Sequence, residues 1–520
     1  MQGALILTAA AIFIKILSAF YRVPFQNIVG DTGFYIYQQI YPLYGIALAL
    51  STYGFPVVIS KLVAEAQGNE NDLQRVAGTS FYVLSAVGLI FFSFLYTGSG
   101  KLAAIMGDKQ LEALVKVISF SFLIMPFVAF TRGLFQGQGD MVPTAISQVA
   151  EQLVRVAAIL LFSFSLIEMG ASLYKVGSGA VFGSILGAAA AALVIYFFRR
   201  RRENKIRLVW PLWTFDSKIA SRLIFQGAAV CLSGMMMVIF QLSDSLSLYN
   251  GLLHSGLAES EAKIEKGVYD RGQPLLQLGT VVATSISLAL VPLITSSYEA
   301  NNKKVLRRYC EASLKAGGSI GMAATFGLIV IMNPVNTMLF ENNKGSIVLS
   351  VFALSILLSS IILTISAILQ GLGHEFSPAY AVLIGALAKY AGNVWLVPLY
   401  GSLGASMSTV LALCLITIIL FVSLKKKVRI RIWSGSLTIK ISGATAGMAG
   451  IVSIWLAFVN RWMPFFEAHR LQMTFQALTG AAIGGIVFGY LILKLKIFKE
   501  DELLLFPFGE KLLSLTKKIP

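Results

Sequence analysis

The sequence predicts an all-α polytopic membrane protein with about fourteen transmembrane helices, made of two six-helix repeat bundles plus two C-terminal helices. Its composition is the first observation. Of 520 residues, 56% are hydrophobic and 13% are charged, and the mean hydropathy is +0.76. The second observation is the recurrence of apolar runs of roughly 18 to 25 residues, the length that crosses about 30 Å of hydrocarbon. A chain this apolar cannot be a water-soluble domain of its size.

Fourteen apolar runs follow one another and leave no room for a soluble domain. They are predicted at residues 4–22, 34–58, 76–96, 112–134, 142–166, 177–198, 223–249, 274–297, 311–334, 347–370, 379–398, 402–424, 440–459 and 473–495. The first run contains Lys15, and no small-residue cleavage site follows it, so we expect a retained span rather than a signal peptide. The predicted domains are a first bundle at 1–205, a second bundle at 206–432, two extra helices at 433–498 and a cytoplasmic tail at 499–520.

The two bundles are predicted from sequence blocks that recur at an offset of about 234 residues. FQGQG, which ends at Gly139 and precedes Pro143, has the counterpart LQGLG, which ends at Gly373 and precedes Pro378. In a second block, Gly33, Tyr35, Gln39 and Gly45 correspond to Gly267, Tyr269, Gln273 and Gly279. Duplicated halves commonly place a transporter's binding site at their interface and allow it to rock between two states.

The distribution of lysine and arginine predicts the orientation. With a cytoplasmic N-terminus, the inner loops and the tail hold 28 of the 42 Lys and Arg residues, and the outer loops hold 11. Positive residues are retained on the cytoplasmic side, so both termini are expected inside. The net charge of +17 needs no nucleic acid, because the clusters Arg199–Arg202 and Lys425–Lys427 suit anionic lipid headgroups.

Cysteine and histidine are too scattered to predict a metal site or a bound cofactor. Cys231, Cys310 and Cys414 are isolated in or beside apolar segments, and the three histidines, at 254, 374 and 469, lack ligand spacing. We expect the cysteines to be small core residues.

Charged and polar side chains inside the first predicted bundle are the candidates for function, since each costs about 2.5 to 3.5 kcal/mol at the centre of a membrane helix. Lys15 and Arg22 are two helical turns apart and share a face, although a terminal arginine can also extend to the membrane surface. Glu151 and Arg155 have the spacing of an ion pair on one helix face. That pair would form a polar seam between helices or line a hydrated cavity.

The second span carries tyrosines at helical spacing, Tyr37, Tyr41 and Tyr44, with Gln39 among them. Tyrosine rings with amide groups suit sugar rings, and they are also common at membrane interfaces. In the second half, Asp244 and Lys389 have no charged neighbour within their own spans, so we predict that they pair with each other across the second bundle.

Three segments carry a resemblance to a known family. Residues 21–66, which begin YRVPFQNIVGDTGFYIYQQIYP, resemble the opening of SpoVB- and MurJ-type polysaccharide and lipid II flippases of the multidrug/oligosaccharidyl-lipid/polysaccharide superfamily. RGLFQGQGDMVPTAISQVAEQLVRV (132–156) resembles their junction of the fourth and fifth spans, and VYDRGQPLLQLGTVVATSISLALVPLIT (268–295) their eighth span. The resemblance covers essentially the whole chain.

This resemblance implies a V-shaped pair of bundles with a cationic cavity, and a groove for the lipid tail at the two C-terminal helices. The basic residues essential in the family, on the first span and at the start of the eighth, match Lys15, Arg22 and Arg271. Asp270 lies beside the last of these, and Gln39 and Gln273 complete the expected substrate-binding residues. A further arginine expected late in the second span is absent, because residues 45–58 read GIALALSTYGFPVV.

Some relatives hold sodium between a carboxylate on the seventh span and polar groups on the eleventh. Asp244 matches the carboxylate, but Lys389 and Asn393 lie near the second position, so an ammonium group can replace the ion. Coupling to a monovalent cation or to the membrane potential is therefore left open. Glu151 and Arg155 complete the candidate coupling or cavity charges.

The predicted function is flipping of an undecaprenyl-diphosphate-linked sugar, either lipid II or a polysaccharide repeat unit, from the inner to the outer leaflet by alternating access. The protein would be a non-enzymatic monomer in a bacterial cell membrane, with the lipid-linked sugar and membrane lipids as partners. One alternative is a multidrug antiporter on the same fold, for which the candidate residues are too basic. The other is a membrane enzyme acting on lipid-linked sugars, for which the outer loop at about 250–273 offers acids and a histidine without catalytic spacing.

Overall fold

The computed structural model describes residues 2–201, 214–428, 435–462, 469–504 and 509–516. Every regular element in these ranges is a helix, and no strand occurs in them. The predicted all-α fold is therefore confirmed. The domain boundaries predicted at 205/206 and 432/433, and Arg202 of the basic cluster, lie outside the described residues.

Contacts divide the chain into two compact units. Unit 1 contains Met1–Asp270 and Pro378–Ala405, and unit 2 contains Arg271–Ser377 and Ser406–Pro520. This division does not follow the order of the two sequence repeats, because helices from the second repeat belong to unit 1. The predicted two-bundle domain organisation stays a prediction.

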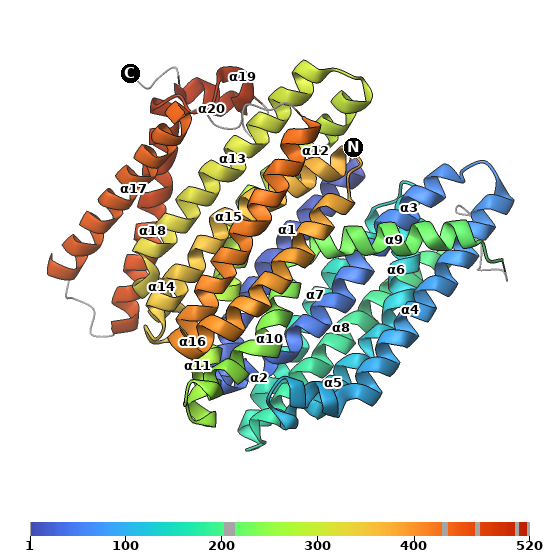
Figure 1. The fold of residues 1–520 in the computed structure, drawn as a ribbon, viewed down its shortest axis with the longest axis horizontal. Helices are drawn as coiled ribbons and strands as arrows, with labels where there is room; N and C mark the ends of the chain where they lie inside the picture. Colours follow the sequence, from blue (N-terminus) through green and yellow to red (C-terminus); the bar gives the residue numbers. More distant parts are fainter. Residues whose placement is uncertain (1, 202–213, 429–434, 463–468, 505–508, 517–520) are drawn as a thin grey trace. The chain divides into compact units, whose positions relative to one another are not determined.

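Unit 1 contains the helices from the N-terminus to Asp270. They are α1 (Gln2–Phe20), α2 (Arg22–Ala49), the π-helix η1 (Leu50–Gly54), α3 (Phe55–Glu65), α4 (Glu70–Ile105), the 3₁₀-helix η2 (Lys109–Leu111), α5 (Glu112–Ser119), α6 (Ser121–Gly137), α7 (Val142–Glu168), α8 (Leu173–Arg201), α9 (Ser217–Gly234), α10 (Met236–His254) and α11 (Glu259–Asp270). Helix α9 lies across α3 and α4 (Figure 1). Helices α10 and α11 pack on α2.

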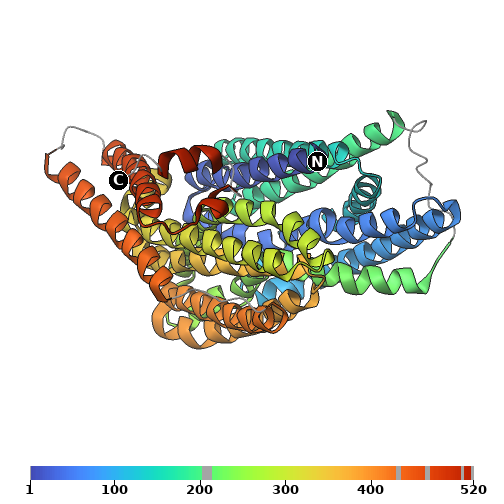
Figure 2. The same ribbon diagram turned by 90° about the horizontal axis from the view of Figure 1, so that it is seen from above.

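Unit 2 contains most of the remaining helices. They are α12 (Gly272–Glu299), α13 (Lys303–Val330), α14 (Met332–Phe340), α15 (Ser346–Gly371), α17 (Gly435–Trp462), α18 (His469–Lys494), α19 (Glu500–Leu503) and α20 (Gly509–Thr516), and α16 (Phe376–Lys427) contributes to both units. Helices α12, α13 and α15 pack on one another, and α17 packs on α18 (Figure 2).

The described helices are long and apolar enough for a multi-pass membrane protein. Ten helical stretches qualify as membrane spans, or eleven if α9 and α10, which are bent by 75° at their junction, form one broken span. Continuous helices join some predicted runs: the stretch Ala9–Glu65 contains the first two, and α16 contains those at 379–398 and 402–424. The number fourteen stays a prediction.

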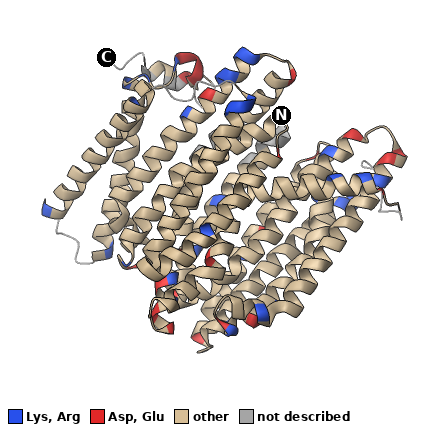
Figure 3. Ribbon diagram, viewed as in Figure 1, with Lys and Arg blue, Asp and Glu red and all other residues tan. Residues whose placement is uncertain are grey.

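Side-chain distribution fits a lipid environment. Lysine, arginine, aspartate and glutamate gather at helix ends, and most of the helix length carries none of them (Figure 3). Large apolar side chains such as Leu161 and Leu193 are 66% and 57% exposed along α7 and α8. Such faces are stable against acyl chains and unfavourable in water.

The long helix α16 is broken at Gly401. This residue has φ 57° and ψ −142°, a conformation that a side chain would strain. The break frees the backbone N–H of Ser402, which donates to Glu265 Oε1 of α11 at 2.9 Å. Helix α11 is thereby tied to the kink in α16.

Candidate functional site

Unit 1 buries several charged side chains. Most of them belong to two groups, which we call the arginine–tyrosine cluster (Tyr21, Arg22, Tyr41, Tyr44 and Arg155) and the lysine–aspartate cluster (Asp244, Lys266, Tyr269, Asp270, Lys389 and Asn393).

Arg22 begins α2 at the point where α1 ends. Its side chain is 2% exposed, and its guanidinium carbon lies 4.3 Å from the centroid of the Tyr41 ring. A guanidinium over an aromatic face gains cation–π attraction, more so when it is desolvated. The alternative that Arg22 extends to the membrane surface is therefore wrong. Lys15 lies seven residues earlier, on α1, and is partly exposed.

Arg155 reaches the same tyrosines from α7. It is fully buried, with its guanidinium carbon 5.3 Å from the Tyr21 centroid and 4.8 Å from the Tyr44 centroid. Its Nη2 donates to Ser18 Oγ at 3.3 Å. The Tyr41 and Tyr44 centroids are 6.1 Å apart, so two neighbouring tyrosine rings each have a guanidinium group near them.

The predicted ion pair between Glu151 and Arg155 is wrong. Glu151 Oε2 instead accepts a hydrogen bond from Arg132 Nη2 at 2.9 Å. Arg132 lies on α6 and also donates to the Ser51 carbonyl of η1 at 3.2 Å and to Ser147 Oγ at 3.1 Å. Helix spacing alone predicts that Glu151 pairs with Arg155. The packing of α6 instead brings Arg132, which is held by two further hydrogen bonds, to the carboxylate.

Sequence reasoning missed Arg132 altogether. It is 0% exposed and lies within the apolar run predicted at 112–134. A charged residue inside an apolar run was the sequence signal that could have identified it as a candidate. Among the described residues, Arg22, Arg132, Arg155 and Arg271 are the largest fully buried side chains.

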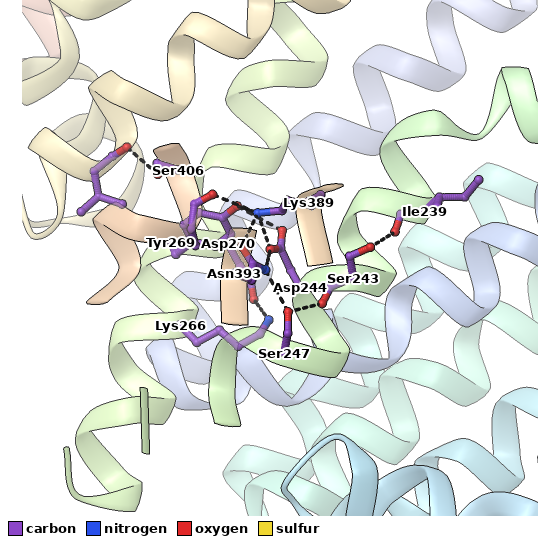
Figure 4. Close-up of polar contacts among 12 residues, drawn as sticks. Ile239, Ser243, Asp244, Ser247, Lys266, Tyr269, Asp270, Lys389, Asn393 and Ser406 are labelled. Atoms are coloured by element: carbon purple, nitrogen blue, oxygen red, sulfur yellow. Dashed lines mark hydrogen bonds and ion pairs between the residues drawn. The ribbon is translucent and has the colours of Figure 1, made fainter. Parts of the chain in front are cut away.

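The lysine–aspartate cluster is built from α10, α11 and α16 (Figure 4). Lys389 Nζ lies 2.6 Å from Asp244 Oδ1, which confirms the predicted pairing of these two residues. A second pair joins Lys266 Nζ to Asp270 Oδ2 at 2.8 Å. All four side chains are buried, so each charge depends on its partner.

Neutral groups surround the ion pair of Asp244 and Lys389. Tyr269 OH donates to Asp244 Oδ2 at 3.0 Å, and Asn393 Nδ2 donates to Asp244 Oδ1 at 2.8 Å. Lys389 Nζ donates to Asn393 Oδ1 at 3.0 Å and to the Ala405 carbonyl at 2.9 Å. The ammonium of Lys389 thus lies among oxygens from both sides of the Gly401 kink.

Lys266 was also missed, because residues 250–273 were predicted to be an outer loop. The structure forms helix α11 from Glu259 to Asp270, and this correction places Lys266 one turn before Asp270. Gly267 packs so closely on α2 that a Cβ atom there would lie 2.1 Å from the Asp31 carbonyl oxygen. The glycine lets α11 approach α2 and buries Lys266 and Asp270.

The remaining candidate residues are not members of either cluster. Gln39 is buried on α2 and donates to the Ser245 carbonyl at 3.3 Å. In unit 2, Arg271 precedes α12, is fully buried and donates to Asn342 Oδ1 at 2.8 Å and to Asn336 Oδ1 at 3.3 Å. Gln273 is buried on α12. Within the described ranges, no three His, Cys, Asp or Glu residues are placed to hold a metal ion.

Comparison with known proteins now identifies the family. Residues 1–298, more than half of the chain, match the family model described as polysaccharide biosynthesis protein. The chain belongs to this polysaccharide biosynthesis protein family. Residues 267–395 also match the MatE family model. The resemblance to SpoVB- and MurJ-type flippases of the multidrug/oligosaccharidyl-lipid/polysaccharide superfamily is confirmed.

Two relatives of this family member come from Bacillus subtilis (strain 168). The protein named uncharacterized membrane protein YabM is 41% identical over 520 residues, which cover 99% of this chain and 96% of the relative. Lipid II flippase MurJ is 24% identical over 516 residues, 94% of each chain.

A solved structure, lipid II flippase MurJ in an inward closed conformation, shares the fold of this family member. Its TM-score is 0.66 at 15% identity, covering 94% of this chain and 99% of that chain. The polysaccharide biosynthesis family member is thus a multi-pass membrane transporter of this superfamily and not an enzyme, and its MurJ relative is named a flippase.

Proposed function

We propose that the protein flips an undecaprenyl-diphosphate-linked sugar from the inner to the outer leaflet by alternating access. The observation that carries this proposal is the arginine–tyrosine cluster. Arg22 and Arg155 are buried in a membrane-embedded unit, and in the described part of the chain neither forms an ion pair. Buried cations without counter-ions are costly, and an anionic headgroup would stabilise both.

The chemistry of the substrate explains why such a cluster is useful. A diphosphate cannot cross hydrocarbon without replacement of its hydration shell, and guanidinium forks provide matching donors. Tyrosine faces suit the apolar faces of sugar rings, while the prenyl tail remains in lipid. Within this proposal Lys15, Arg22, Arg271, Gln39 and Gln273 bind the substrate, and Asp270 acts through its ion pair with Lys266.

The proposal includes an orientation and a source of energy. Both termini lie in the cytoplasm of a bacterial cell, and the protein acts as a monomer. Lys389 already neutralises Asp244, which favours the membrane potential over a bound sodium ion as the driving force. Moving two negative charges outward through the full field gains about 4 to 5 kcal/mol per 100 mV.

The proposed function is tested with purified protein in liposomes that carry either lipid II or another undecaprenyl-diphosphate-linked glycan. We expect the protein to accelerate the flipping of one of them well above the rate in protein-free liposomes and to spare the other. Because the MurJ relative is named lipid II flippase, lipid II is the first substrate to try. If neither glycan flips faster than in protein-free liposomes, the proposed function is wrong.

A multidrug antiporter is the second candidate, since residues 267–395 match the MatE model. The arginine–tyrosine cluster argues against it, because two buried guanidinium groups repel the cationic drugs that such antiporters would carry. The same liposomes, loaded with a fluorescent lipophilic cation under a proton or sodium gradient, should show no protein-dependent efflux.

A further inference from the structure

We propose, on the basis of the function proposed above, that Arg155 binds one phosphoryl group of the diphosphate while Arg22 binds the other. Arg132 then acts as a positioning residue, because it holds Glu151 and so keeps Arg155 without a counter-ion. The ligand chemistry is a group with two adjacent phosphoryl units attached to a lipid.

Both arginines have donors left for a ligand. Arg155 Nε and Nη1 and Arg22 Nε are buried and make no hydrogen bond to the described residues. The two guanidinium groups lie over neighbouring rings, Arg22 over Tyr41 and Arg155 over Tyr44, whose centroids are 6.1 Å apart. Two neighbouring guanidinium groups fit two neighbouring phosphoryl groups: Arg155 has two open donors, enough for a bidentate contact, and Arg22 has one.

The acids near the two arginines are already committed to other cations. Glu151 is four residues before Arg155, the spacing at which a helix normally forms an ion pair. Arg132 holds it at 2.9 Å and is itself fixed by Ser147, Thr52 and the Ser51 carbonyl. Asp270, another buried acid of unit 1, is held by Lys266 at 2.8 Å.

Arg22 and Arg155 therefore carry positive charges that no acid among the described residues neutralises. A buried charge without a partner destabilises the protein, so binding of an anion with two charged groups would be favoured.

Binding of short prenyl ligands to the purified full-length protein tests this inference. Farnesyl diphosphate and farnesyl monophosphate serve as probes in isothermal titration, with inorganic pyrophosphate as a third ligand that lacks the lipid. For Arg155→Gln we expect the Kd for farnesyl diphosphate to rise at least about tenfold, the loss of one charge-assisted interaction. The Kd for the monophosphate, which needs only Arg22, should change less than about threefold.

A double substitution tests the positioning role of Arg132. Arg132→Gln should weaken diphosphate binding as Arg155→Gln does, because Glu151 becomes free to pair with Arg155. Adding Glu151→Gln should restore the affinity of the Arg132→Gln protein, whereas it should not rescue Arg155→Gln. The matched control is Arg222→Gln, which removes an exposed arginine paired with Glu65 in the same unit and should leave every Kd unchanged.

The binding results test the role of Arg155 and the role of Arg132 separately. Wild-type affinity of Arg155→Gln for the diphosphate would overturn the role of Arg155. A double variant that binds as weakly as Arg132→Gln would overturn the role of Arg132, and unfolding temperatures without ligand identify any variant weakened by misfolding. If the binding pattern is found but the liposomes show no flipping, this inference stands and the proposed function fails.

Discussion

Replacing Arg22 with alanine is expected to slow flipping of the lipid-linked sugar by about 10- to 150-fold, the effect of losing about 1.5 to 3 kcal/mol of charge-assisted hydrogen bonding. Arg22 is 2% exposed, stacks on Tyr41 and keeps an open donor, so its loss removes binding capacity as well as charge. Arg271→Ala, in unit 2, should slow flipping to a similar extent. The rates are measured in liposomes at equal amounts of inserted protein.

A conservative change separates charge from geometry in this experiment. Arg22→Lys keeps the charge but loses the planar fork, so its rate should lie between those of wild type and Arg22→Ala. Arg222→Ala, at the exposed pair with Glu65, should flip at the wild-type rate. Wild-type rates from both Arg22→Ala and Arg271→Ala would show that these arginines are not part of the site.

Replacing Lys389 with methionine is expected to destabilise the protein by about 3 to 5 kcal/mol, the cost of leaving one member of a buried ion pair without its partner. Asp244 is 2% exposed, and Lys389 Nζ lies 2.6 Å from its Oδ1. Tyr269 and Asn393 would still donate to the carboxylate but cannot neutralise it. The loss is measured as the change in free energy of unfolding in detergent.

Two double variants distinguish the ion pair from general damage to the core. Asp244→Asn with Lys389→Met removes both charges and should be clearly more stable than Lys389→Met alone. The swap of Asp244→Lys with Lys389→Asp should recover part of the loss. Arg307→Met, at a partly exposed pair with Glu311, should cost less than about 1 kcal/mol. Double variants as unstable as the single variant would contradict the pairing.

Much of the fold could be predicted because the hydrophobic effect acts on local sequence. The apolar runs became helices, and the run boundary at about Gly401 marks the break in α16. The pair of Asp244 and Lys389 was also predictable, since neither residue has another charge in its own span. A charge that cannot be neutralised locally must find its partner on another helix.

The parts that could not be predicted depend on which helices meet in space. Glu151 had a local candidate in Arg155, and only the packing of α6 against α7 shows that Arg132 takes it instead. Lys266 was assigned to a loop because α11 is polar along much of its length. Its burial follows from the close contact between Gly267 and α2, which no local pattern encodes.

The most direct measurement compares one glycan on two lipid anchors in liposomes that contain the wild-type protein. In one, the glycan is joined to undecaprenol through a diphosphate; in the other, it is joined directly to the same prenol without phosphate. If the buried arginines receive an anionic headgroup, the protein accelerates flipping of the diphosphate-linked glycan and leaves the uncharged one at the protein-free rate. Equal acceleration of both, or of neither, would contradict this account of the site.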